Sequence, residues 1–217
     1  MAKLYVSNKD ESVRIFDSSF LEAFSKVHWT VPLYIFIPVI LYSLYNAIVI
    51  GFSAGYIISL VLAGVFIWTF TEYSLHRWLF HFHPKNEKLQ KIFWTFHGVH
   101  HDYPQDSKRL VMPPSVSIPI STLFFFIFRA IVGPESVYPF FAGFMVGYLF
   151  YDITHYAIHH FNFKGDSNVW KGLKDWHALH HYKYDELGFG VSSPMWDYVF
   201  RTTYPEKDSS VKIQNNE

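Results

Sequence analysis

Cysteine is absent from the sequence, and charged residues are scarce. Without cysteine the chain has no disulfide bond, no thiolate ligand for zinc or haem and no cysteine nucleophile. Charged residues make up 17 % of the sequence, compared with about 25 % in ordinary soluble domains. The formal net charge is zero, so nothing favours nucleic acid as a partner. The composition instead favours a membrane protein.

The longest uncharged run covers residues 30–71, which include no Asp, Glu, Lys, Arg or His. A membrane-spanning helix needs about 20 apolar residues, so this run accommodates two. We expect helices near residues 32–50 and 55–75, joined by a turn that uses Asn46 and Gly51. A buried helical pair of a soluble protein is the alternative, but the run offers no polar face to water.

A second apolar pair covers residues 110–128 and 136–151, with Arg129 and Glu135 in the link. The first of these segments contains three prolines, so we expect it to begin irregularly. The second continues into "DITHYAIHH". Together the patterns predict an all-α integral membrane protein with four transmembrane helices in two hairpins. We expect residues 1–217 to form a single domain.

Four spans place residues 76–109 and 159–217 on the same side of the membrane as the N-terminal segment, residues 1–29. Lysine and arginine concentrate in these polar stretches, whereas Arg129 alone falls on the opposite side. The positive-inside rule therefore predicts that the polar stretches form a histidine-rich helical cap in the cytosol. The polar C-terminal tail, residues 204–217, belongs to the same side.

Histidine is unusually frequent, with 13 in 217 residues. Twelve of them form four short blocks: His76, His81 and His83; His97, His100 and His101; His155, His159 and His160; His177, His180 and His181. Residues three and four apart on a helix are neighbours, at about 5–6 Å. Each HXXHH block therefore presents three imidazoles on one helical face. The repeated pattern predicts a metal site.

Imidazole nitrogen binds Zn, Cu, Fe and Ni, and one ion takes about four to six ligands. The number of histidines exceeds that, so two metal ions fit better than one. Nitrogen ligation without thiolate suits dioxygen activation at iron, which a lipid tail could reach along the apolar helices. A histidine-rich tag or tail would be one contiguous tract. A membrane metal carrier would place ionisable residues near the midplane of its spans.

The motifs HX4H, HXXHH, HXXXHH and HXXHH resemble the membrane fatty acid hydroxylase superfamily. The closest likeness is to the fatty acid 2-hydroxylases of sphingolipid metabolism, and it extends beyond histidine. The segments "EYSLHRWLFHFHP", "FWTFHGVHHDYPQDSKRLVMPP" and "LHHYKYDELGFGVSSPMWDYVFRT" are similar to landmarks of that family. The likeness covers roughly residues 16–203.

The resemblance implies a membrane di-metal oxygenase that hydroxylates a lipid acyl chain at carbon 2, using dioxygen and external electrons. The implied cofactor is a pair of metal ions, generally iron, although zinc can occupy such sites. The ten ligands that it implies are His76, His81, His97, His100, His101, His155, His159, His177, His180 and His181. His28 and His83 fall outside this set. His160 also falls outside, although it could substitute for the adjacent His159.

Two carboxylates are candidates for supporting the ligands. Metal-bound histidines normally donate their second N–H to a carboxylate or a carbonyl. Glu72 lies one turn before His76, and Asp152 lies three residues before His155. Because both emerge from apolar helices, we expect them to accept such hydrogen bonds. His160 is a further candidate for supporting the ligands.

Many eukaryotic members of the family carry a cytochrome b5 domain with a haem-binding His-Pro-Gly-Gly motif, which this sequence lacks. We therefore expect a separate electron donor that is cytochrome b5-like, ferredoxin-like or reductase-like. A sterol desaturase or carotenoid hydroxylase of the same superfamily is the alternative function, because the motif spacing barely separates these enzymes. A membrane metal carrier is the alternative outside catalysis.

Overall fold

The computed structural model of the chain describes residues 4–163 and 169–205. Helices account for the regular structure in these ranges, and no residue within them forms a strand. The prediction of an all-α fold is therefore confirmed. Of the predicted C-terminal tail, residues 206–217 lie outside the described part.

The chain divides into two compact units. We call Arg14–Thr71 with Val111–Ile153 the helical unit. We call Met1–Val13 with Glu72–Leu110 and Thr154–Glu217 the histidine unit. The expected single domain of residues 1–217 remains a prediction.

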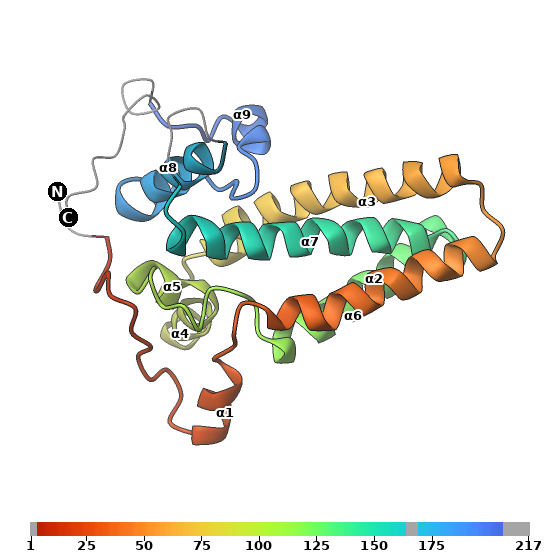
Figure 1. Cartoon of the computed structure of the whole chain (residues 1–217). Coiled ribbons are helices and arrows are strands. Elements are labelled where there is room, and N and C mark those ends of the chain that lie inside the picture. Colours follow the sequence, from red (N-terminus) through yellow and green to blue (C-terminus); the bar gives the residue numbers. More distant parts are fainter. Residues whose placement is uncertain (1–3, 164–168, 206–217) are drawn as a thin grey trace. The chain divides into compact units, whose positions relative to one another are not determined.

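Four long helices supply most of the helical unit (Figure 1). In chain order its helices are α1 (Ser19–Phe24), α2 (Val31–Val49), most of α3 (Ala54–Ser74), α6 (Pro114–Val132) and most of α7 (Val137–His160). The long helices lie close to the apolar segments read from the sequence. α6 begins only at Pro114 because Pro113 adopts an extended conformation.

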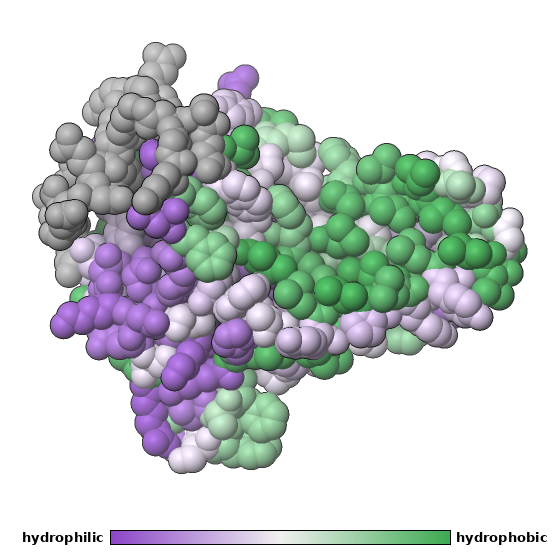
Figure 2. All heavy atoms as spheres, in the orientation of Figure 1, coloured by the Kyte–Doolittle hydropathy of each residue, from purple (hydrophilic) through white to green (hydrophobic). Residues whose placement is uncertain are grey.

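Three helical segments in the described part are long and apolar enough to cross a membrane: Val31–Val49, Ala54–Phe80 and Pro114–Val132. Figure 2 shows hydrophobic side chains over much of the visible face of these helices. The expected fourth segment exists as α7, but it is not among the three. Its tyrosines, its glycines and Asp152 lower its hydropathy.

α7 contributes most of the buried core of the helical unit. The ring of Phe144 lies 5.1 Å from that of Trp68 on α3 and 4.8 Å from that of Phe128 on α6. Tyr148 meets Phe36 of α2 edge to face at 5.2 Å. Aromatic pairs at such distances are favourable beyond the area that they bury. The four long helices therefore share one aromatic core.

Glycine lets α3 and α7 approach closely. A Cβ atom on Gly143 would lie 2.0 Å from the carbonyl oxygen of Val61, and one on Gly64 would lie 2.0 Å from that of Phe140. Small residues at helix contacts are typical of membrane proteins, where close packing replaces the hydrophobic effect as the driving force.

Short helices build the histidine unit: the π-helical turn η1 (Leu75–Phe80), α4 (Glu87–Phe93), the π-helical turn η2 (Trp94–Gly98), α5 (Val99–Asp102), α8 (Val169–Tyr182) and α9 (Met195–Phe200). The N-terminal segment joins this unit. The backbone N–H groups of Val6 and Ser7 both donate to the carbonyl oxygen of Asp102, and Tyr182 donates to the side chain of Asn8.

Candidate metal centre

The HX4H block depends on a π-helical turn. Five residues amount to about 1.4 turns of an α-helix, so His76 and His81 would point in different directions there. The wider η1 turn has hydrogen bonds from residue i+5 to residue i, and the N–H of His81 donates to the carbonyl oxygen of His76. The two rings consequently lie 5.0 Å apart. Such turns occur frequently at functional sites.

The structure gathers ten histidines into two groups of five, each with one nitrogen per residue within 4.8 Å of the others. Group A contains His76, His81, His97, His101 and His180. Group B contains His100, His155, His159, His177 and His181. All ten lie in the histidine unit, and they are the ten that the resemblance implies as ligands. Their role as ligands remains a prediction.

Each HXXHH block supplies both groups. His97 and His101 are one helical turn apart and join group A, whereas His100 between them joins group B. The second block reverses this assignment: His177 and His181 join group B, and His180 joins group A. The two groups are adjacent, because the rings of His101 and His181 stack at 4.3 Å. Each block therefore divides its three imidazoles between the two groups.

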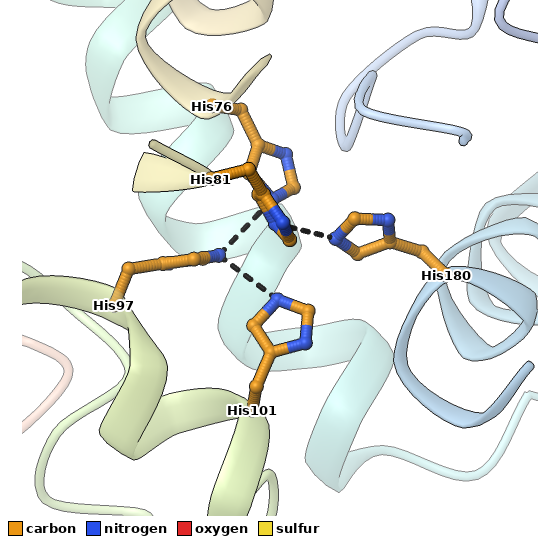
Figure 3. Close-up of side chains that lie close together, drawn as sticks. All are labelled: His76, His81, His97, His101 and His180. Atoms are coloured by element: carbon orange, nitrogen blue, oxygen red, sulfur yellow. Dashed lines mark hydrogen bonds between the residues drawn. The ribbon is translucent and has the colours of Figure 1, made fainter. Parts of the chain in front are cut away.

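The imidazole nitrogens of group A converge on one point (Figure 3). Nε2 of His97 lies 3.1 Å from Nε2 of His76 and 3.0 Å from Nε2 of His101. A neutral His97 has at most one hydrogen on Nε2 and cannot donate to both. His76 also donates from Nδ1 to the carbonyl oxygen of Phe189 at 2.5 Å, which leaves a lone pair on its Nε2.

Group B repeats the close spacing of the Nε2 atoms. Nε2 of His177 lies 3.1 Å from Nε2 of His155 and 2.9 Å from Nε2 of His181. Ligands at right angles on an ion with metal–nitrogen bonds of about 2.1 Å lie about 3.0 Å apart. Lone pairs that converge at this spacing fit a metal cation, so the residues of both groups suit the metal that they are predicted to hold.

Burial keeps these imidazoles neutral, as metal ligands must be. Burial lowers the pKa of His97, His100 and His177 well below the usual value of 6.5, and neighbouring imidazoles lower it further. Burial likewise lowers the pKa of His180 to about 4. At neutral pH a metal cation can therefore bind without first displacing protons from these imidazoles.

The three remaining histidines lie outside both groups. His28 is exposed and contacts the hydroxyl of Thr30 through Nδ1 at 2.8 Å. His83 is exposed, and His160 stacks on Tyr156 with ring centroids 4.5 Å apart.

Neither expected carboxylate bonds directly to an imidazole in the described chain. Glu72 accepts hydrogen bonds from the N–H groups of Val191 and Ser192 and from the Ser192 hydroxyl. Asp152 accepts from the Tyr148 hydroxyl at 2.8 Å and from the N–H of Met112 at 3.4 Å. The expectation of direct carboxylate support is thus not met by these contacts.

Backbone carbonyls take the place of carboxylates for two imidazoles. Nδ1 of His180 donates to the carbonyl oxygen of Leu187 at 2.7 Å, as His76 does to Phe189. Both carbonyls lie in the 187–193 loop, which sequence reasoning had assigned no role. Asp197, buried and bonded to the same loop, was also missed. It lies in a segment that resembles a landmark of the family, but no histidine spacing singled out this carboxylate.

The helices and this site define a helical membrane protein with a histidine-rich centre able to hold metal ions. The sequence profile of the fatty acid hydroxylase family matches residues 61–202. The chain belongs to this family and is an oxidoreductase of the hydroxylase type, so the resemblance read from its motifs is confirmed.

Similar proteins include a dihydroceramide fatty acyl 2-hydroxylase of Arabidopsis thaliana, 39 % identical over 88 % of this chain and 80 % of that protein. A fatty acid 2-hydroxylase of Rattus norvegicus is 37 % identical over 90 % of this chain, and the match spans only 58 % of the rat protein. The solved structure of full-length scs7p, in which only the hydroxylase domain is visible, has a TM-score of 0.81 at 35 % identity. That likeness covers 89 % of this chain and 72 % of the other.

Proposed function

We propose that the chain hydroxylates carbon 2 of the acyl chain of a membrane lipid, either a fatty acid or a ceramide. The observation that carries this proposal is the convergence of ten histidines into two groups in a chain of this family. The names of the Arabidopsis and rat relatives, which specify 2-hydroxylation, support the position of the reaction.

In this proposal each group holds one metal ion, and the metal is iron, with zinc able to occupy the same nitrogens. Bound iron would supply the activation of dioxygen, one atom of which enters a C–H bond while the other leaves as water with two electrons and two protons from outside. The number of imidazoles and the absence of cysteine favour two such nitrogen-bound ions.

The protein's own contribution is to hold the imidazoles and exclude water. The side chains of His180 and His181 are fully buried, so the nitrogens of these two residues are shielded from bulk solvent. Their neutral state leaves each ligand lone pair available. Exclusion of water strengthens the electrostatic interactions in the site and protects reactive species from side reactions.

The proposal also includes the membrane topology. A single hydroxylase domain with four spans, α7 being the fourth, would carry the histidine unit as a cytosolic cap. The concentration of lysine and arginine in the polar stretches supports this orientation. Electrons would come from a separate cytochrome b5-like, ferredoxin-like or reductase-like donor.

Lipid mass spectrometry tests the reaction. Cells that express the chain, cells that express the His100→Ala variant and cells that express neither are supplied with isotopically heavy dioxygen. Acyl chains are then released from their lipids and analysed. We expect heavy 2-hydroxy acyl chains only with the unaltered protein. Unchanged 2-hydroxy acyl lipids in cells that contain the folded protein would refute 2-hydroxylation.

The same samples separate the alternatives. A sterol desaturase or a carotenoid hydroxylase would change sterols or carotenoids and leave acyl chains unaltered. A metal carrier would alter the metal content of cells without introducing oxygen into lipid. Its ionisable residues would lie near the midplane of the spans, whereas residues 30–71 contain none.

A further inference from the structure

The 187–193 loop determines how two imidazoles of group A are oriented. The carbonyl oxygen of Leu187 accepts from Nδ1 of His180 at 2.7 Å, and that of Phe189 accepts from Nδ1 of His76 at 2.5 Å. A hydrogen held on Nδ1 leaves Nε2 as the nitrogen that can bind a metal. The loop therefore fixes both the ring orientation and the tautomer of these two histidines.

Asp197 holds the opposite side of the same loop, and its side chain is fully buried. Its Oδ1 accepts from the N–H of Phe189 at 2.9 Å, and its Oδ2 accepts from the N–H of Gly190 at 2.9 Å. The N–H of Gly190 and the carbonyl of Phe189 belong to one planar peptide group. Asp197 thus holds one end of that peptide group while His76 bonds to the other end.

A second peptide group leads to Asp197 through Thr202. The carbonyl of Leu187, which accepts from His180, shares its peptide group with the N–H of Gly188. That N–H donates to the carbonyl oxygen of Thr202 at 2.8 Å. The Thr202 hydroxyl donates to Oδ1 of Asp197 at 2.7 Å. Both carbonyls that face group A are therefore tied to one carboxylate.

The residue at position 190 must be small for this arrangement. A Cβ atom on Gly190 would lie 2.1 Å from the carbonyl oxygen of Ser193 and 2.8 Å from Oδ2 of Asp197. Glycine therefore allows the carboxylate to approach the loop backbone directly. This close approach gives the peptide group little freedom to turn away from His76.

We propose that Asp197 is a positioning residue for group A, which holds the carbonyl oxygens of Leu187 and Phe189 against His180 and His76 and so directs both Nε2 atoms at a divalent metal ion. This inference rests on the proposed two-metal centre. In the described chain, the hydrogen bonds of the loop to imidazole are those to His76 and His180. Loss of Asp197 should therefore weaken the binding of only one of the two ions, the ion in group A.

Glu72 provides a matched control, because it is a buried carboxylate bonded to the same loop. Its Oε1 accepts from the N–H groups of Val191 at 2.9 Å and Ser192 at 2.8 Å, and its Oε2 accepts from the Ser192 hydroxyl. In Glu72→Gln the amide oxygen can keep both N–H groups, and the amide nitrogen can donate to the hydroxyl. In Asp197→Asn one backbone N–H must face an amide N–H instead.

Both substitutions replace a buried carboxyl group that bonds to the 187–193 loop with an amide, so they separate the hydrogen-bond geometry from the loss of a carboxyl group. The full-length protein in lipid nanodiscs is loaded with Zn²⁺ and then mixed with excess chelator that reports metal release. Removal of an outer hydrogen-bond partner typically weakens metal binding by about 10- to 100-fold. We expect Asp197→Asn to release one of its two ions about 10- to 100-fold faster than the unaltered protein. Glu72→Gln should release both at the unaltered rates.

Two sets of histidine substitutions, each combined with Asp197→Asn, show which group holds the ion that is released faster. With His155, His159 and His177 replaced by alanine, group B keeps only two imidazoles, so group A is the remaining tight site and Asp197→Asn should still accelerate release. With His81, His97 and His101 replaced by alanine, group A keeps only two imidazoles, so group B is the remaining tight site and Asp197→Asn should have no effect. A general loss of structure would accelerate release with both sets and lower the unfolding temperature, and it would overturn the proposal.

A milder variant keeps the test decisive if Asp197→Asn does not fold. Thr202→Val removes one donor to Asp197 and should accelerate release of the group A ion by a smaller factor. Unaltered release from Thr202→Val would then overturn the positioning role. If the unaltered protein itself does not hold two Zn²⁺ ions, the two-metal centre fails instead, and the two failures are distinguishable.

Discussion

The buried neutral histidines should make the metal-free protein sensitive to acid. Burial lowers the pKa of His180 from the usual 6.5 to about 4 in the folded protein. At pH values between about 4 and 6.5, His180 is protonated in the unfolded chain but mostly neutral in the folded protein. Stability is therefore greatest above the unfolded-state pKa and falls as the pH drops toward the folded-state pKa.

The size of this effect follows from the two pKa values. A difference of one pKa unit corresponds to about 1.36 kcal/mol. The change from 6.5 to about 4 therefore costs about 3 kcal/mol once the pH is well below both values. At about pH 5 the unfolded form is almost fully protonated and the folded form about one-tenth protonated, which gives about 2 kcal/mol from His180 alone.

The assay compares the unaltered protein with His180→Asn, both metal-free in detergent micelles. Asparagine can keep a donor toward the carbonyl of Leu187 but cannot take up the proton. Burial raises the pKa of Asp197, which opposes the histidine effect, so the difference between the two proteins is the useful quantity. Between about pH 7.5 and 5, the unaltered protein should lose about 2 kcal/mol more unfolding free energy than the variant. Equal losses would refute the reasoning.

Further predictions concern helix packing and the ligands. Gly143→Ala should lower the unfolding free energy by about 1–3 kcal/mol, because its Cβ would lie 2.0 Å from the Val61 carbonyl oxygen. Gly55→Ala, with open space around the new Cβ, should change the unfolding free energy by less than about 0.5 kcal/mol, and both glycine variants are measured in the same micelles as His180→Asn. His100→Ala should abolish hydroxylation and lower the bound metal, whereas His28→Ala should change neither. A metal-depleted or inactive but folded His28→Ala protein would contradict the assigned ligands.

The helices were the most predictable part of the fold. Residues 30–71 are uncharged, so their two helices could be located from composition, and α2 and α3 lie within about two residues of the expected bounds. The approach of α3 to α7 could not be predicted in the same way. The approach requires the face of α3 that carries Gly64 to pack against the face of α7 that carries Gly143. This contact depends on tertiary packing, which the pattern of either helix alone does not predict.

The identity of the clustered histidines was predictable, but their distribution was not. Spacing indicates that His97 and His101 are neighbours, but it does not show that His100 joins the other group. The HX4H spacing of His76 and His81 argues against a shared face on an α-helix. The wider η1 turn brings His76 and His81 to the same side. No residue type within this turn predicts a π-helical conformation.

Support for the ligands was the least predictable part. Sequence proximity suggested Glu72 and Asp152, whereas the observed acceptors are backbone carbonyls of Leu187 and Phe189. Every residue has a carbonyl, so the sequence carries no signal for this role. Asp197 bonds to the backbone next to those carbonyls because the loop folds back onto it. The spacing of residues along the sequence does not predict this contact.

The central claim is that each group of five histidines holds one metal ion. Metal analysis of the purified full-length protein, combined with anomalous scattering at the metal absorption edge, tests it most directly. We expect two tightly held ions per chain, one enclosed by group A and the other by group B. A single ion shared between the groups, or ions bound elsewhere on the chain, would contradict the account.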